Sequence, residues 1–394
     1  MARNDNEFVT LSLSENSPGS GLIVVTLAML GVGVVAVHSA LAGVLPSTSA
    51  WHARSDMRHT LFAVAAALIM CFGWHFRYRW LGGKPSRWPV AAIVVLLVAI
   101  TLVALVYVPG LGHVRNHRLR WLKLGPAPFG IFQPSELLKI ALLIFLAAWF
   151  SHERTEARSF LKGFLPTLGI TGICLGLVVT EDLGTAVIMA VAVWLTMFIA
   201  GVRWYALTGM IAAGAGGFWY FVSSDPRRLE RMQAMINPWC LDNPSAYQPR
   251  QSLLAILTGG WFGKGLGKGI IKQQYLPERS TDFIFASFSE EWGFVGAMLL
   301  MGLVIMWIWF ARKSATNAPD RFGFILAGAL GAMIAIQMVL HIAVDTVAAP
   351  PTGMSFPFVS VGGTALLVTA GAASLIVSVS AGAKRRRMPE PPDG

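Results

Sequence analysis

The sequence predicts an all-α polytopic membrane protein with about ten transmembrane helices. Of its 394 residues, 55% are hydrophobic and 13% are charged, whereas soluble domains carry about 25% charged residues. The mean hydropathy is +0.60, and the charged residues cluster between apolar runs, as expected if those runs face lipid. The net charge of +11 therefore concerns orientation and anionic lipid or substrate. No nucleic-acid-binding signature accompanies it, so we expect no nucleic-acid partner.

The two ends of the chain are predicted to be short cytoplasmic tails. Residues 1–20 are polar and lack a basic n-region, so the first apolar run is expected to be a retained helix and not a cleaved signal. Residues 383–394 are basic and then rich in proline, which predicts a disordered end. The cysteines lie far apart and the histidines show no metal-ligand spacing, so the sequence predicts no metal site.

The apolar runs between these tails predict one transmembrane domain, residues 21–382. A helix needs about 20 apolar residues to cross a bilayer. The triplet Thr180-Glu181-Asp182 separates two runs so closely that they should form a tight helical hairpin. A large outer loop, about 223–283, is expected between the seventh and eighth helices. The candidate spans are roughly 21–45, 60–75, 89–108, 135–150, 164–180, 183–201, 204–222, 284–310, 321–343 and 362–382.

Lysine and arginine in the short loops predict the orientation. They gather at 77–87, 154–162, 203 and 312–321, which places both termini in the cytoplasm. Two outer segments are basic as well, the one before the fourth span and the large loop. Because long loops translocate regardless of charge, the large loop does not contradict this orientation. Their charge indicates either a solvated face that touches anionic lipid headgroups or a basin for an anionic substrate.

The large outer loop is the longest part of the chain without a spanning apolar run, and it is expected to carry chemistry. Its first part, Pro226 to Met235, predicts a short interfacial helix with its apolar residues on one side and its arginines on the other. Lys264, Lys268 and Lys272 are spaced by four, but the glycines between them favour a loop over a helix.

Asp282 stands at the end of this loop, just before the eighth span. The structural interpretation is an acidic residue in the first turn of a helix, with Ser280 or Thr281 as the cap. The functional interpretation is a partly desolvated carboxylate, whose raised pKa would let it act as a general base near neutral pH.

Four more charged residues fall within apolar runs, where a charge is costly unless it is paired or faces water; they are Glu136, Lys139, Glu290 and Glu291. Glu136 and Lys139 are three apart and so share a helix face, after Gln133 and a proline at the start of the fourth span. They either pair with each other or line a cavity. Glu290 lies in the eighth span, and it is either a buried hydrogen-bonded carboxyl or a second cavity-lining residue.

The last outer loop runs from Asp345 through Thr352, Gly353 and Ser360 to Gly363. Three prolines and three glycines within it imply broken backbone at membrane depth, which must be shielded by protein or line a cavity. Free backbone amides there could contact a pyrophosphate, although packing alone would also explain the composition.

Four segments together resemble the SEDS (shape, elongation, division and sporulation) family of FtsW/RodA-like peptidoglycan polymerases. The resemblance extends from about residue 20 to 382. NPW and YLPE favour the division type, while GWFGKG and LPER also suit the elongation type. The segments are RWLKLGPAPFGIFQPSELLK, YQPRQSLLAILTGGWFGKGLG, YLPERSTDFIFASFSEEWGF and PPTGMSFPFVSVGG.

The resemblance implies an enzyme of the bacterial cytoplasmic (inner) membrane that polymerises lipid II at the outer face. Asp282 matches the aspartate taken as catalytic, and Glu136 and Lys139 match polar residues that line the central cavity. The expected partners are lipid II, a class B penicillin-binding protein transpeptidase, and other divisome or elongasome membrane proteins. The remaining residues expected to bind substrate or line the cavity are Gln133, Arg120, Lys264, Lys268, Glu278, Arg279, Thr281, Glu290, Asp345, Thr352, Gly353 and Ser360.

The chain also departs from the family pattern. Thr180-Glu181-Asp182 replaces a Gln-Pro-Asp, Asp345 stands where an asparagine is usual, and Val361 replaces a tyrosine. No cofactor is identified, although a divalent cation, Mg²⁺ or Mn²⁺, is compatible with a pyrophosphate donor. The alternatives to an enzyme are a flippase for a lipid-linked precursor and a non-catalytic scaffold of the cell-wall synthesis complex.

Overall fold

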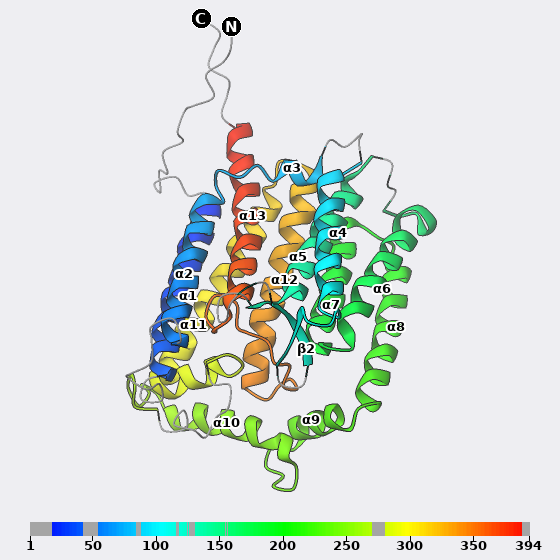
Figure 1. The fold of residues 1–394 in the computed structure, drawn as a ribbon. Helices are drawn as coiled ribbons and strands as arrows, with labels where there is room; N and C mark the ends of the chain where they lie inside the picture. Colours follow the sequence, from blue (N-terminus) through cyan, green and yellow to red (C-terminus); the bar gives the residue numbers. More distant parts are fainter. Residues whose placement is uncertain are drawn as a thin grey trace, which may run out of the picture.

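The computed structural model describes residues 18–41, 54–83, 88–115, 118–123, 125, 131–153, 155, 157–269 and 280–387, which form a helical bundle with a small sheet at one end (Figure 1). The helices are α1 (Pro18–Leu41), α2 (Ser55–Phe72), α3 (Arg79–Gly82), α4 (Val90–Leu105), α5 (Pro134–Ser151), α6 (Leu165–Val179), α7 (Leu183–Ala200), α8 (Trp204–Ser223), α9 (Pro226–Ile236), α10 (Tyr247–Gly259), α11 (Ile284–Thr316), α12 (Arg321–Asp345) and α13 (Gly363–Arg387). A π-helical turn, Phe160–Phe164, precedes α6, and a 3₁₀ turn, Pro244–Ala246, precedes α10.

The spanning helices confirm the expected polytopic fold. Nine helices in the described part of the chain are long and apolar enough to cross a membrane. The third expected span corresponds to α4, which is apolar but has only 16 residues. At a rise of about 1.5 Å per residue, it is shorter than a bilayer core of about 30 Å. The hairpin between α6 and α7 is as predicted, and Asp182 caps α7 by accepting a hydrogen bond from the Thr185 N–H at 3.1 Å.

The core of the bundle lies around α5 and α12. In the most apolar stretch of α5, 78% of the residues are buried, against 61% for α12 and 17% for α8. α5 packs on α4, α7 and α12, and α12 also contacts α11 and α13. α8 stands at the edge of the bundle (Figure 1). The charged pair that the sequence places in α5 therefore lies near the start of the most buried spanning helix.

The outer loop forms two helices that lie across one end of the bundle. α9 confirms the short helix predicted for Pro226 to Met235, and Asp225 caps it by accepting from the Arg227 N–H at 3.0 Å. α10 continues the layer towards α11, and α3 lies at the opposite end of the bundle (Figure 1).

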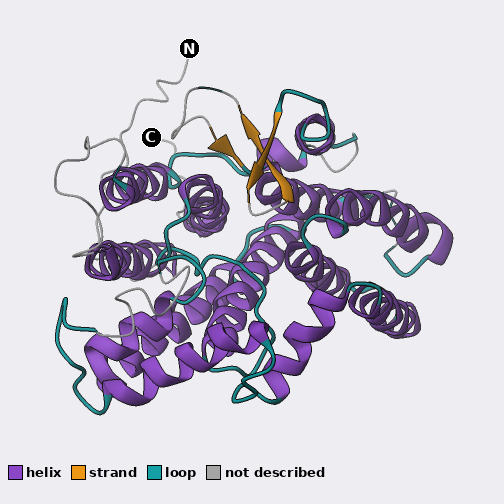
Figure 2. Ribbon diagram, turned by 60° about the horizontal axis from the view of Figure 1, so that its bottom comes forward, coloured by secondary structure: helices purple, strands orange, loops and turns teal. Residues whose placement is uncertain are grey.

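The segment before α5 contains three short strands that the sequence analysis did not predict (Figure 2). They are β1 (Gly112–Arg115), β2 (Arg118–Lys123) and β3 (Ile131–Phe132), and they form an antiparallel sheet in the order β1-β2-β3. Leu122 of β2 pairs with Phe132 of β3, and β3 is followed directly by the start of α5.

α11 is broken at Gly293, whose φ of 67° and ψ of −167° are not helical. The loop after α10, residues 260–265, runs along the break and replaces the lost helical hydrogen bonds, as backbone groups in lipid require. Its four bonds to α11 are Lys264 N to Glu290 O (3.0 Å), Gly265 N to Glu291 O (3.0 Å), Phe294 N to Gly260 O (2.8 Å) and Val295 N to Trp261 O (3.1 Å).

This close approach predicts a large effect of Gly293→Ala. A Cβ at this position would lie 2.3 Å from the Gly263 nitrogen and 2.6 Å from the Trp261 oxygen, at a positive φ. We expect the free energy of unfolding to fall by about 2 kcal/mol or more, seen as a lower melting temperature of the detergent-solubilised protein. The matched control is Gly302→Ala in the same helix, where a Cβ meets nothing within 4 Å. Equal melting temperatures for the two variants would contradict this account.

Candidate functional site

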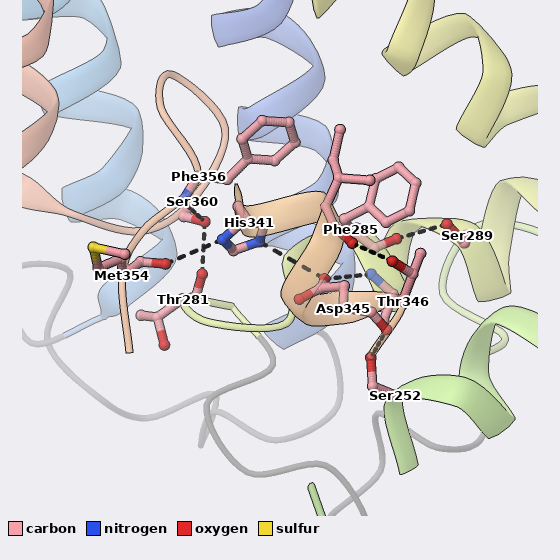
Figure 3. Close-up of polar contacts among 12 residues, drawn as sticks. Ser252, Thr281, Phe285, Ser289, His341, Asp345, Thr346, Met354, Phe356 and Ser360 are labelled. Atoms are coloured by element: carbon pink, nitrogen blue, oxygen red, sulfur yellow. Dashed lines mark hydrogen bonds and ion pairs between the residues drawn. The ribbon is translucent and has the colours of Figure 1, made fainter. Parts of the chain in front are cut away.

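Asp282 lies in the turn that leads into α11. The N-cap position of α11 is occupied by Phe283, which gives no side-chain cap, and not by Ser280 or Thr281 as the spacing suggested. The last outer loop holds the turn instead. The Ser360 hydroxyl donates to the Thr281 carbonyl at 2.6 Å (Figure 3), and the Val361 N–H donates to the Ser280 carbonyl at 2.9 Å.

The last outer loop also reaches the Asp282 side chain. Gly353 is exposed and has a φ of 71°, and a methyl group built on it would lie 3.6 Å from Asp282 Oδ2. One residue earlier, the Thr352 carbonyl lies 3.0 Å from the position of a Cβ on Gly184, at the start of α7. The prediction of broken backbone in this loop is confirmed, because residues 346–362 contain no helix or strand. The structure therefore brings Gly353 to Asp282, and it brings Thr352 to the start of α7.

The two charged residues of α5 form a buried ion pair. Lys139 Nζ lies 2.9 Å from Glu136 Oε1, and Lys139 is only 2% exposed. Glu136 also lines a cavity of about 10 Å³, the room that about one water molecule needs. Ser360 of the last outer loop lines the same cavity. Pairing, one of the two interpretations left open by the sequence, is therefore seen for Glu136 and Lys139, while the role of Glu136 in a substrate cavity stays a prediction.

Gln133 marks the entry to α5 at its N-cap position. Its backbone N–H donates to the Thr364 hydroxyl at 3.4 Å, and its side-chain amide donates to the Ser135 hydroxyl at 3.3 Å. It therefore ties the start of α5 to the start of α13, on the side where the last outer loop ends.

Arg120 reaches the α6–α7 hairpin from β2. Its Nη1 lies 3.1 Å from Asp182 Oδ2, and its Nε donates to the Glu181 carbonyl at 2.8 Å. The Leu119 N–H donates to Glu181 Oε2 at 3.1 Å. The acidic pair in the hairpin, which departs from the family pattern, therefore binds the sheet that carries Arg120.

Glu290 is fully buried and pairs with Lys264, whose Nζ lies 2.8 Å from Glu290 Oε1 and 2.9 Å from the Thr258 hydroxyl. Lys264 and Lys268 lie in a loop, as the glycines predicted, and Lys268 is exposed. Glu278 and Arg279, as well as Lys272, lie outside the described residues.

Asp345 was expected to bind substrate or line the cavity, but the structure buries it completely at the end of α12. Its partners include His341, which the sequence analysis missed together with Ser252, Gln337 and Thr369. The signal for His341 was its spacing of four residues before Asp345, which places both on one helix face. Gln337 and Thr369 line the Glu136 cavity.

Comparison with known proteins identifies relatives along nearly the whole chain. Stage V sporulation protein E of Bacillus subtilis is 36% identical, covering 94% of this chain and 99% of that protein. A probable peptidoglycan glycosyltransferase FtsW of Saccharophagus degradans is 34% identical, covering 75% and 76%. RodA of Thermus thermophilus shares the fold, with a TM-score of 0.65 at 24% identity over 94% of this chain and 97% of that one.

A second solved structure, described as showing the coordination of polymerization and crosslinking by a peptidoglycan synthase complex, superposes with a TM-score of 0.73 at 24% identity. It covers 91% of this chain and 96% of that chain. Residues 20–385 match the family described as cell cycle protein, FTSW_RODA_SPOVE. This multi-pass membrane protein therefore belongs to the FtsW/RodA/SpoVE family.

Proposed function

We propose that this chain is a peptidoglycan glycosyltransferase that polymerises lipid II into glycan strands, with Asp282 as its catalytic residue. Family membership supports the activity, and one observation supports the site. Asp282 stands in a turn held by the last outer loop, with the exposed Gly353 beside its carboxylate, so polar backbone and a carboxylate meet at the end of a spanning helix.

We also propose that this site faces the outside of the bacterial inner membrane and that both termini are cytoplasmic. The short basic loops support this orientation. α3, which begins at Arg79, and the C-terminal end of α13 lie at the end of the bundle opposite α9 and α10 (Figure 1), and basic loops remain on the cytoplasmic side.

The proposed reaction needs one proton acceptor and a place for a leaving pyrophosphate. The 4-hydroxyl of the acceptor sugar attacks the anomeric carbon of the donor, and Asp282 takes the hydroxyl proton. The new glycosidic C–O bond forms as the C–O bond to the pyrophosphate breaks, and the pyrophosphate leaves with the electron pair. Attack opposite the leaving group inverts the configuration, giving a β-1,4 link from an α-linked donor.

Basic residues at the outer end would stabilise the charge of the pyrophosphate. Arg120 and Lys264 each hold a carboxylate already, Asp182 and Glu290 respectively. If they also bind the pyrophosphate, each must contact both its carboxylate and the phosphate. Lys268, in the same loop as Lys264, is exposed. Arg279 remains a candidate from the sequence.

A divalent cation on the donor pyrophosphate stays a prediction. Within the described ranges, no three His, Cys, Asp or Glu side chains gather where they could hold a metal ion. Mg²⁺ is commonly bound by one or two carboxylates together with substrate phosphates, so the proposed ion does not require such a group.

Asp282→Asn tests the assigned role. The amide cannot accept the hydroxyl proton, so we expect polymerisation of labelled lipid II to fall about 10²–10⁴-fold, with an unchanged melting temperature. The control is Asp242→Asn, the same chemical change at an exposed residue of the outer loop. The measurement is glycan chain length and rate, made with a co-expressed transpeptidase present. A parental rate in Asp282→Asn would remove Asp282 from the mechanism, and lipid movement without polymerisation would favour the flippase alternative.

The proposed partner is a class B penicillin-binding protein, docked on the outer loops and on α11 and α12. The likeness to a chain from a peptidoglycan synthase complex supports such a partner. Leu299 of α11 and Val339 of α12 are 65% and 54% exposed, as a helix-docking surface in lipid requires.

Enlarging these side chains should weaken the docking. Overpacking an interface costs about 1–3 kcal/mol, so we expect Leu299→Trp with Val339→Trp to reduce co-purification of the transpeptidase about tenfold or more. The control is Ile211→Trp on α8, which is 55% exposed. Undiminished co-purification of the double variant would move the interface to another surface.

A further inference from the structure

Asp345 connects three segments at the outer end of the bundle while being 0% exposed. It is the last residue of α12. Its carbonyl accepts a hydrogen bond from the Ser252 hydroxyl of α10 at 2.6 Å, and its Oδ2 accepts from the Ala286 N–H of α11 at 2.9 Å (Figure 3). The Asp345 side chain thus reaches the beginning of the helix that follows Asp282.

This second contact replaces the missing cap of α11. The first N–H groups of a helix have no partner within the helix, and a side-chain oxygen normally accepts from the third of them. Ala286 is the third residue of α11, and the N-cap residue Phe283 supplies no such oxygen. Asp345 supplies it from another helix, where the positive end of the helix dipole favours a carboxylate. The turn that carries Asp282 is therefore anchored at its base by Asp345.

His341 lies one helical turn before Asp345 and faces the same carboxyl group. Its Nε2 lies 3.7 Å from Asp345 Oδ2, and its Nδ1 lies 3.0 Å from the Met354 carbonyl (Figure 3). A carbonyl only accepts, so Nδ1 carries a hydrogen and donates it. A neutral imidazole then presents the lone pair of Nε2 to the carboxyl group. At 3.7 Å the two atoms lie just beyond hydrogen-bond distance, and Nε2 has no hydrogen-bond partner among the described residues. A single proton on either Nε2 or the carboxyl group would remove the repulsion between two acceptors and leave the pair neutral.

The histidine also fixes the last outer loop. Its ring stacks on Phe356, with centroids 4.9 Å apart and planes at 14°. The Phe356 N–H donates to the Ser360 hydroxyl at 2.8 Å, and this hydroxyl donates in turn to the Thr281 carbonyl. Met354 directly follows Gly353, the residue beside the Asp282 carboxylate. The His341–Asp345 pair therefore acts on the Asp282 turn from both sides, through the start of α11 and through the last outer loop.

We propose that His341 and Asp345 form a neutral, proton-sharing pair that positions Asp282, an inference that rests on the proposed function of that residue. Both are buried, His341 at 3% and Asp345 at 0% exposed, so they are positioning residues that do not touch substrate. Their removal should lower the rate of the reaction and leave substrate binding in place.

Three variants test whether His341 and Asp345 act as a pair or independently. Asp345→Asn keeps a side-chain oxygen for the Ala286 N–H and stays neutral, so its kcat should stay within about fivefold of the parent. His341→Phe keeps the stacking but removes the group that shares a proton with the buried Asp345 carboxyl, and a displaced Asp282 should lower kcat about 10–100-fold with KM nearly unchanged. The double variant should recover most of that loss, because a neutral amide at 345 needs no proton-sharing partner. The matched control is Thr346→Ala, an exposed residue at the end of the same helix.

Hydrogen exchange of the amides in 280–287 and 353–361 gives a readout that does not depend on activity. We expect faster exchange in both segments of His341→Phe, and parental exchange in Asp345→Asn and in the control. A parental kcat and parental exchange in His341→Phe would overturn the proposal, as would a double variant no better than His341→Phe.

A failure of the His341–Asp345 proposal can be told apart from a failure of the proposed function. That function fails if Asp282→Asn polymerises lipid II at the parental rate, or if the parent does not polymerise it in the presence of the transpeptidase. In either case the exchange measurements still decide whether the pair holds the turn.

Discussion

Backbone N–H and C=O groups at membrane depth have no water to bind, so each must find a partner within the protein. Within the described residues, α11 is broken at Gly293, and the last outer loop joins α12 to α13 without helix or strand. Residues 260–265 satisfy the first break, and contacts with the 280–283 turn and His341 satisfy part of the second. The break at Gly293 separates the first part of α11 from the rest of the helix. The contacts at the second break support the Asp282 turn. The shape of the site therefore depends on the hydrogen bonds that satisfy the backbone groups at these two breaks.

Buried and partly buried charged side chains likewise find partners within the protein. Lys139, Lys264 and Arg120 each contact a carboxylate within 3.1 Å. The basic outer segments were interpreted from sequence either as a solvated face or as a basin for an anion, and Arg120 and Lys264, which each bind a carboxylate of this chain, fit neither description alone. Pairs of this kind are not strong sources of stability, but loss of one partner is costly. Arg120 joins β2 to the α6–α7 hairpin and Lys264 joins the loop after α10 to α11, whereas the Lys139–Glu136 pair lies within α5.

The sequence predicted the spanning helices, the α6–α7 hairpin, α9 and the broken last loop, because each depends on local pattern. Lipid demands long apolar runs, and proline and glycine mark where they end. The small sheet was missed because its strands have two to six residues, too few to show an alternating pattern. The cap of α11 was assigned to nearby Ser280 or Thr281, whereas Asp345 provides it from 59 residues away. Local spacing does not encode such tertiary contacts. The roles of Arg120 and Glu290 depended in the same way on partners distant in sequence.

The contact between the loop after α10 and the α11 break has a consequence for how this sequence can change over evolution. A side chain on Gly263 would lie 2.0 Å from the Glu291 oxygen and 2.6 Å from the Gly293 nitrogen, and one on Gly293 would lie 2.3 Å from the Gly263 nitrogen. Each glycine leaves room for the backbone of the other, and both have a positive φ. Drift at one position therefore cannot be accommodated by a compensating side chain at the other. Descendants of this chain should keep both glycines or lose both together, along with the fold of the loop that joins them.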